Sequence, residues 1–317
     1  MIPVFGADPD LVWLFGSVAA FLVMATSASL MLKASLRGEA AQATMANVMV
    51  RVRAWWVLAA AFVIALAIGH AGLTALFGLA SFLALREFIT LAPTRRGDHR
   101  ALCWIFFVIA PLQYWLVARG WYGLFSVLIP VYAFLFLPIQ SALIGDPERF
   151  LERTADIQWG LMVCVYCLSH APALLTLDIP GYEGENAKLL VFLVLVTQIS
   201  DVLQFVWGKT LGRRRIAPTI SPNKTWGGFL GGVSSATLIG TALWWATPFT
   251  PWQAAGMSLV ITLLGFLGGL TMSAIKRDRG VKDYGTLIEG HGGVLDRIDS
   301  LCFAAPLFFH LTRYFFT

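Results

Sequence analysis

The sequence predicts an all-α integral membrane protein that crosses the bilayer about ten times. Three observations predict this class. Apolar residues make up 58% of the 317 residues, charged residues make up only 13%, and the mean hydropathy is +0.73. Soluble domains carry about 25% charged residues, so this chain has too few charges to cover a water-facing surface. The composition therefore argues against a soluble enzyme, a disordered chain and a nucleic-acid partner, although the net charge is +5.

Ten apolar stretches have a length suited to crossing a bilayer, which takes about 20 residues. Backbone amides in hydrocarbon must be hydrogen-bonded within their own segment, so each stretch is predicted to be a helix. The second and third are separated only by a tight turn at Gly69-His70-Ala71-Gly72. The ten spans are predicted near residues 11–32, 54–69, 71–91, 101–118, 120–144, 157–177, 189–208, 227–247, 253–275 and 300–316.

The basic residues test this count, because 20 of the 23 fall in alternate connections on one side. Only Arg119, Lys188 and Arg313 fall on the other side. By the positive-inside rule the basic side is cytoplasmic, and an even number of spans then places both termini outside. The basic connections contain Lys33, Arg37, Arg51 and Arg53; Arg86, Arg95, Arg96 and Arg100; Arg149 and Arg153; Lys209, Arg213, Arg214, Arg215 and Lys224; and Lys276, Arg277, Arg279, Lys282 and Arg297.

The cysteines do not predict a disulfide framework. Cys103, Cys164, Cys167 and Cys302 all lie inside apolar stretches. Cys164 and Cys167 have CxxC spacing, but without polar neighbours they are interpreted as packing residues, since a free cysteine behaves as a small hydrophobe. Residues 1–10 contain no Lys or Arg, so no signal peptide is expected.

Three polar islands in the C-terminal half are not explained by topology. The largest, residues 276–299, holds five of the eighteen acids together with five basic residues and His291. Asp296 and Asp299 are three residues apart and share one face of a helix. Clustered carboxylates repel unless a cation lies between them, and hard oxygen ligands favour Mg²⁺. Gly292 and Gly293 precede that helix, where backbone amides can approach an anion. The alternative is a solvated loop with salt bridges.

The second island, Ser221-Pro222-Asn223-Lys224-Thr225, presents hydroxyls and an ammonium group at a predicted helix start. This is typical of a phosphate or nucleotide site. The third is Asp201, inside the apolar span 189–208. A carboxylate there costs about 2.5–3.5 kcal/mol on insertion scales, so it should face a cavity and have a partner. A capping role at the end of the span is the alternative. Glycines spaced four apart in 227–232 and 265–269 predict close helix packing around these islands.

These islands, in this order, resemble the phosphatidate cytidylyltransferase (CDP-diacylglycerol synthase) family, in a divergent bacterial-type branch. The family signature reads Ser-x-apolar-Lys-Arg, then Lys-Asp, then His-Gly-Gly-x-x-Asp-Arg-x-Asp. This chain matches it at 273–277, 282–283 and 291–299. The family's Ser-Pro-x-Lys-Thr-Trp appears at 221–226, and its membrane aspartate aligns with Asp201. Leu85-Arg86-Glu87-Phe88 also resembles a family feature.

The resemblance implies two regions, an N-terminal set of about six spans (1–188) and a catalytic membrane region (189–317). It implies the reaction CTP + phosphatidate → CDP-diacylglycerol + pyrophosphate. The nucleophile would be a lipid phosphate oxygen, which needs no general base because its second pKa is about 6. The implied catalytic residues are Asp283, Asp296, Lys276, Arg277, Lys282 and Arg297. The implied substrate-binding residues are Ser221, Lys224, Thr225, His291, Gly292 and Gly293. The implied Mg²⁺ ligands are Asp201, Asp283, Asp296 and Asp299.

The expected partners are CTP, phosphatidate or a similar lipid phosphate, and the lipid bilayer, with a homodimer left open. After the membrane aspartate the family tends to small residues and tyrosine, whereas Val202-Leu203-Gln204-Phe205 follow here, so the acceptor lipid is not decided. We expect the inner (cytoplasmic) membrane of a bacterium, with the active site facing the cytoplasm. Two alternatives remain, a CTP-dependent lipid-alcohol kinase and an ion-coupled transporter using Asp201. A CDP-alcohol phosphotransferase would need an Asp-Gly-x-x-Ala-Arg motif, which is absent.

Overall fold

The computed structural model describes residues 9–35, 39–288, 290 and 292–317, and within them the chain forms ten long helical segments. Each predicted span overlaps one of these segments, so the all-α fold class is confirmed. Seven segments are single helices: α1 (Pro9–Ser35), α2 (Glu39–Ile68), α3 (His70–Leu91), α10 (Asn186–Thr210), α11 (Trp226–Ala242), α12 (Pro251–Asp278) and α13 (Leu295–Phe316). The turn predicted at residues 69–72 is shorter in the structure, because Gly69 alone separates α2 from α3, with φ of 88°, and residues 70–72 belong to α3.

The other three segments are interrupted, each by a π-helical turn. Pro111 follows the first π turn and Pro130 lies within the second. Because proline has no backbone N–H, it cannot continue the α-helical hydrogen-bond ladder. The pieces are η1 (Arg96–Asp98), α4 (His99–Trp104), η2 (Ile105–Ile109) and α5 (Ala110–Ala118); α6 (Tyr122–Val127), η3 (Leu128–Ala133) and α7 (Phe134–Ala142); and α8 (Phe150–Leu161), η4 (Met162–Cys167), α9 (Leu168–Ala173) and η5 (Leu174–Thr176).

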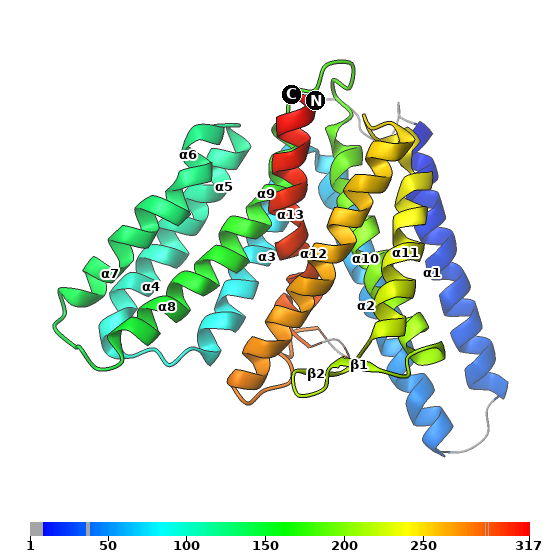
Figure 1. Cartoon of the computed structure of the whole chain (residues 1–317), viewed down its shortest axis with the longest axis horizontal. Coiled ribbons are helices and arrows are strands. Elements are labelled where there is room, and N and C mark those ends of the chain that lie inside the picture. The colour runs from blue at the N-terminus through cyan, green and yellow to red at the C-terminus, as the bar shows by residue number, and fades with distance from the viewer. Residues whose placement is uncertain (1–8, 36–38, 289, 291) are drawn as a thin grey trace.

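Eight of the ten segments are long and apolar enough to cross a membrane, as judged over the described residues. The other two are α11, which has 17 residues, and α13, whose first turn carries charges. Both pack against α12 within the bundle. Figure 1 shows that α1 begins and α13 ends at one end of the bundle, while the polar connections after α10 and α12 lie at the opposite end. Which end faces the cytoplasm stays a prediction.

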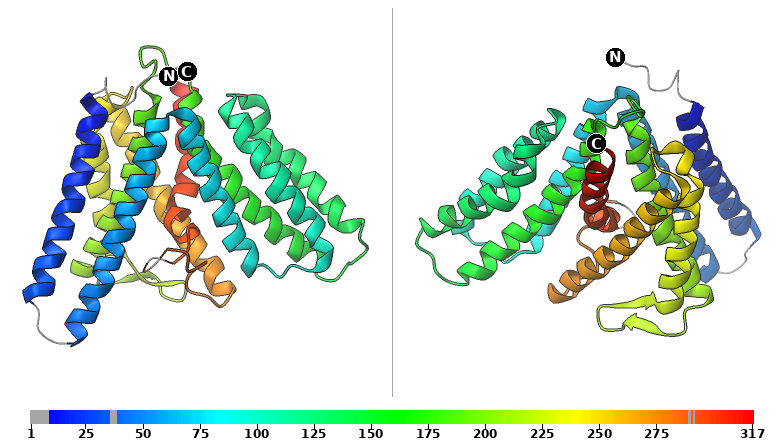
Figure 2. Two further views of the ribbon diagram at one scale, coloured as in Figure 1. Left: turned by 180° about the vertical axis from the view of Figure 1, so that it is seen from behind. Right: turned by 45° about the horizontal axis from the view of Figure 1, so that its top comes forward.

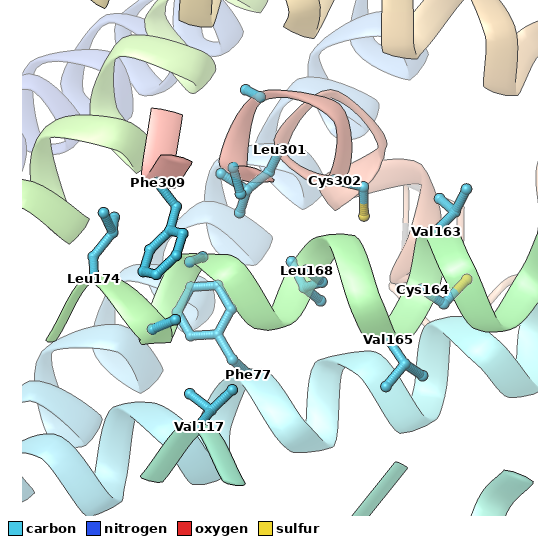
Figure 3. Close-up of a cluster of buried hydrophobic side chains, with 14 of the residues drawn as sticks. Phe77, Val117, Val163, Cys164, Val165, Leu168, Leu174, Leu301, Cys302 and Phe309 are labelled. Atoms are coloured by element: carbon cyan, nitrogen blue, oxygen red, sulfur yellow. The ribbon is translucent and has the colours of Figure 1, made fainter. Parts of the chain in front are cut away.

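Helix α13 is the centre of the bundle and packs against α3, α9, α10 and α12. Figure 1 shows α4 to α8 fanned out on one side of it and α10, α11 and α1 on the other. Its buried side chains, such as Leu301 and Phe309, meet Phe77 and Leu168 in one apolar core (Figure 3). All four cysteines are free, and Cys164 and Cys302 are buried in this core, which agrees with their interpretation as packing residues.

The glycine-rich helices pack closely, at Gly231 and Gly232 of α11 and at Gly268 of α12. A Cβ atom at Gly231 would lie 2.6 Å from Trp207 Cγ, and one at Gly268 would lie 2.7 Å from Phe303 Cβ. A Cβ atom at Gly232 would lie 2.7 Å from Gln204 Cα. Because these distances are far below van der Waals contact, only glycine permits α11 to approach α10, and α12 to approach α13, this closely. We refer to Gly231 and Gly232, the α11 glycines that meet Trp207 and Gln204 of α10, as the glycine seam.

A small antiparallel hairpin, which no pattern in the sequence predicts, connects α10 to α11. It consists of β1 (Arg215–Ala217) and β2 (Ser221–Thr225), with Ala217 paired to Ser221. Thr225 ends the hairpin and caps α11, because its Oγ1 accepts a hydrogen bond from Gly228 N at 3.1 Å. Arg277, at the end of α12, holds the hairpin through a 3.2 Å bond from its Nε to Ile220 O.

Candidate active site

A cavity of about 960 Å³ is lined by residues from the end of the bundle that carries the polar connections. Figure 2 shows the connections at this end of the bundle from two further sides. Four elements line it, namely α2, α10, the connection between α12 and α13, and the first turn of α13. Residues more than 200 positions apart in the sequence therefore meet at one site. The lining residues are Arg51, Trp55, Gln198, Asp201, Val202, Phe205, Lys282, Asp283, Gly285, Thr286, Ile288, Gly290, Gly292, Asp296 and Arg297.

Asp296 has the most hydrogen bonds among the cavity carboxylates. Its Oδ1 accepts a 2.7 Å bond from Lys276 Nζ, which is also an ion pair. Its Oδ2 accepts bonds from Tyr284 N at 2.8 Å and Gly293 N at 2.9 Å. The carboxylate is thus held rigidly, and the Gly293 amide that was predicted to bind phosphate donates to Asp296 in this structure.

Asp201 lies on α10 with its side chain exposed in the cavity. Its Oδ1 accepts a 3.2 Å hydrogen bond from Ser300 Oγ on α13. Behind it, Lys224 reaches in from β2 and donates a 3.1 Å bond to Phe266 O. Burial lowers the pKa of Lys224, and the carboxylates of Asp201 and Asp299 oppose this shift. The membrane aspartate and the Ser-Pro-x-Lys-Thr motif therefore meet beside the cavity.

Three further charged residues face the cavity without an ion pair to another described residue. Lys282 and Asp283 are exposed on the connection, and Arg297 lies on the first turn of α13. The Nε of Arg297 is buried and has no hydrogen-bond partner among the described residues. Charges in this state are available to a ligand that carries both phosphates and a cation.

Not every predicted site residue lines the cavity. Ser221, Thr225 and Gly293 lie outside the lining, and the Thr225 hydroxyl caps α11. Arg277 binds the carbonyls of Ile220 and Val281 and so supports the hairpin and the connection. Lys276, Lys224 and Asp299 also lie outside the lining, and Lys276 forms an ion pair with the lining residue Asp296. His291 lies outside the described residues.

The family model of the cytidylyltransferases matches residues 49–315, which is most of the chain. The chain belongs to the cytidylyltransferase family. It is therefore a nucleotidyltransferase enzyme, and the resemblance inferred from its motifs is confirmed.

Two kinds of relative are similar to this cytidylyltransferase. An uncharacterized protein of Escherichia coli (strain K12), YnbB, is 41% identical over 272 residues, which cover 84% of this chain and 88% of that protein. A phosphatidate cytidylyltransferase of Staphylococcus aureus (strain COL) is 38% identical over 127 residues. One of Synechocystis sp. is 45% identical over 132 residues. These two matches cover 39% and 40% of this chain and 49% and 45% of the relatives, so the chain matches about half of each enzyme.

The structure adds residues to the site that the sequence interpretation did not assign. Arg51 and Trp55 of α2 form one wall of the cavity, although they precede the motif region by about 150 residues. They lie four residues apart and so share one face of the helix. Glu87 of α3, noted before only as part of a resemblance, accepts hydrogen bonds from the start of α13. From the sequence alone Arg51 is only a topology signal, because no local motif surrounds it.

Two cavity carboxylates are oxygen donors of the kind that Mg²⁺ takes. Among the described residues, no three Asp, Glu, His or Cys side chains form a ready metal cluster. Mg²⁺ is usually bound by one or two carboxylates together with substrate phosphates, rather than by a cage made only of protein. Asp201 and Asp283, both exposed in the cavity, provide such a donor set.

Proposed function

We propose that this cytidylyltransferase transfers CMP from CTP to the phosphate of a membrane lipid, either phosphatidate or a close relative. The products would be CDP-diacylglycerol and pyrophosphate. The observation that carries the proposal is the single cavity in which Asp201, Asp283 and Asp296 meet Lys282 and Arg297 at one end of a membrane-spanning bundle. The relatives named phosphatidate cytidylyltransferase support the choice of acceptor.

In the proposed step, a lipid phosphate oxygen attacks the α-phosphorus of CTP. A new P–O bond forms, the bond from the α-phosphorus to the α–β bridging oxygen breaks, and pyrophosphate leaves with the bond electrons. The attacking phosphate is already ionised near neutral pH, because its second pKa is about 6, so no residue has to remove a proton. The main barrier is repulsion between two anions. Lys282 and Arg297 would reduce it by stabilising the charge that develops on the phosphates.

We further propose that Mg²⁺ enters with CTP and is held by Asp201 and Asp283. When bound, the ion would neutralise phosphate charge and stabilise the leaving pyrophosphate. Asp296, whose two oxygens accept three hydrogen bonds, would orient Lys276 and the surrounding backbone. Asp299 lies close enough to Lys224 to oppose the lowering of its pKa and would balance charge behind the cavity.

The two substrates differ in where they come from. Val202 and Phe205 are exposed apolar side chains on the α10 wall of the cavity, one and four residues from Asp201. We propose that the lipid chains lie against these residues while the phosphate faces the charged lining. CTP would enter from the end of the bundle with the basic connections, which we expect to face the cytoplasm of a bacterial inner membrane.

Incubating the purified protein with labelled CTP, Mg²⁺ and phosphatidate tests the proposal. The expected products are a CDP-linked lipid and pyrophosphate, with turnover lost on chelation by EDTA and restored by added Mg²⁺. Phosphorylated lipid formed from diacylglycerol, without any CDP-lipid, would instead favour the lipid-alcohol kinase. Lipid uptake that does not depend on CTP would favour the transporter. The Asp283→Asn variant is the matched negative control, because it changes one cavity charge at nearly constant shape.

A further inference from the structure

Glu87 is an acid inside the long apolar helix α3, where the residue is only 9% exposed. A carboxylate in a membrane-spanning helix is costly unless it has partners. Its described hydrogen-bond partners are two backbone amides from α13. Val294 N donates to Oε1 and Leu295 N donates to Oε2, both at 2.9 Å.

These two amides are at the start of α13, where a helix has N–H groups with no partner inside the helix. Val294 occupies the N-cap position, but its apolar side chain cannot accept a hydrogen bond. Glu87 therefore caps α13 from a position 207 residues earlier in the chain. A carboxylate at a helix N-terminus also interacts favourably with the helix dipole. The first amides of α13 are consequently occupied and are not left for a substrate phosphate.

Two glycines of the connection leave room for this carboxylate. A Cβ atom at Gly285 would lie 2.8 Å from Glu87 Oε1, and one at Gly293 would lie 2.6 Å from Glu87 Cδ. At both positions the three nearest atoms all belong to Glu87. A side chain at either place would therefore force the Glu87 carboxylate to shift, and neither glycine has a positive φ.

The contact links α3 to the cavity lining. Next to Glu87, Phe88 stacks on Tyr284 with ring centroids 6.1 Å apart. Tyr284 N and Gly293 N both donate to Asp296, so the carboxylate of Asp296 is held by the same segment that Glu87 fixes. The segment from Tyr284 to Asp296 is thus attached to α3 near both of its ends.

We propose that Glu87 is a positioning residue for nucleotidyl transfer: it holds the start of α13 so that Asp283, Asp296 and Arg297 face the cavity. It lies outside the cavity lining and touches no reacting atom. This role of Glu87 rests on the proposed function only in the experiments that measure turnover. It makes the motif region depend on a helix that precedes it by about 200 residues.

The first test replaces Glu87 with glutamine. Glu87→Gln keeps the shape but turns one acceptor into an NH₂ group that faces a backbone N–H. We expect kcat/KM for CTP to fall about 10- to 100-fold, the effect typical of residues that orient a site from behind. Glu183→Gln is the matched control, because Glu183 also accepts a backbone amide, from Gly181 N at 2.9 Å, but lies on an exposed connection far along the chain from the cavity. It should leave kcat/KM unchanged.

The second test measures hydrogen–deuterium exchange of the peptide 284–296 in detergent. Exchange of the Val294 and Leu295 amides should accelerate at least tenfold in Glu87→Gln and stay unchanged in Glu183→Gln. Faster exchange with normal turnover would mean that Glu87 only stabilises the fold, and it would overturn the proposal. Unchanged exchange would overturn it as well. CTP affinity is measured alongside with Mg²⁺ present. If the wild type forms no CDP-lipid, the proposed function fails. The amide exchange rates and the affinity for CTP then still decide the role of Glu87.

The Gly285→Ala variant covers the case in which Glu87→Gln does not fold, because it keeps the Glu87 carboxylate. A double-mutant cycle tests whether the two residues are coupled. Gly285→Ala should lower turnover and accelerate exchange in the wild type, because the new methyl group meets the Glu87 carboxylate. In a Glu87→Ala background the same change should have little further effect, since the obstacle is gone. Effects that simply add, or a Gly285→Ala single variant that matches the wild type, would overturn the proposal.

Discussion

Two groups of charged residues lie at the same end of the bundle and differ in how their charges are used. The first group lies at the ends of α4, α7 and α8. In this group Arg153 is 2% exposed, and its Nε lies 3.1 Å from Asp98 Oδ2. Its Nη1 donates a 2.9 Å bond to Asp146. In the cavity, Asp296 is the one lining residue that forms an ion pair within the part of the chain that the structure describes.

The difference separates charges that stabilise the fold from charges that are available to a ligand. A buried charge is stable only when it is paired, so the Arg153 group contributes to the folded state itself. Charges that face a cavity without protein partners are instead typical of functional sites. Substitutions in the Arg153 group should therefore change the free energy of unfolding, whereas substitutions in the cavity should change turnover.

The largest effect is expected for Arg153→Met. Removing the guanidinium leaves Asp98 buried without its cation, and breaking a buried pair in this way costs about 3–5 kcal/mol of unfolding free energy. Denaturant unfolding in detergent micelles measures this loss. Turnover per folded molecule should stay close to that of the wild type. A stable Arg153→Met protein that has lost turnover would contradict the separation of the two groups.

The next largest effect is expected for Asp283→Asn, with the opposite signature. Asp283 is exposed and makes no hydrogen bond or ion pair with another described residue, so the unfolding midpoint should not move. Removing a group that stabilises transition-state charge typically lowers kcat by about 10²–10³-fold. Steady-state kinetics with CTP and lipid phosphate checks this prediction. Normal kinetics would remove Asp283 from the proposed metal site.

A smaller effect is expected for Arg51→Gln on the α2 wall. A hydrogen bond between a guanidinium and a phosphate contributes about 1.5–3 kcal/mol, so KM for the lipid should rise about tenfold or more. Arg53→Gln is the matched control, because two residues along an α-helix point about 200° apart. KM for the lipid should be unchanged in that variant. Equal effects of both substitutions would show that general charge, and not the cavity wall, attracts the lipid.

The smallest effect is expected at the exposed edge of the Arg153 group. Arg95 pairs with Glu148, but these side chains are 42% and 60% exposed. Exposed ion pairs contribute little, because water and salt screen them. Arg95→Gln should leave both the unfolding midpoint and turnover unchanged within error. A clear loss of stability would mean that the exposed pair is part of the buried group.

Features that depend on local composition were predictable from the sequence. The ten helical segments follow from hydropathy, and the close packing of α11 and α12 follows from the spacing of their glycines. The partners of Arg153 could not be predicted, because Asp98 is 55 residues away and spacing does not indicate which connections meet. From the sequence alone Arg95 and Arg153 are therefore only topology signals. The same reason explains why the position of Arg51 at the cavity and the role of Glu87 were missed.

The glycine seam has a consequence for how genetic data on this enzyme should be interpreted. In a saturation-mutagenesis screen scored by growth, every replacement of Gly231 or Gly232 would rank among the most harmful variants, because each adds atoms where Trp207 and Gln204 already lie. Neither glycine lines the cavity. The positions that do not tolerate substitution would thus lie along one face of α11 and would resemble a catalytic surface. Only kinetics on the purified variants would distinguish this packing face from a catalytic surface.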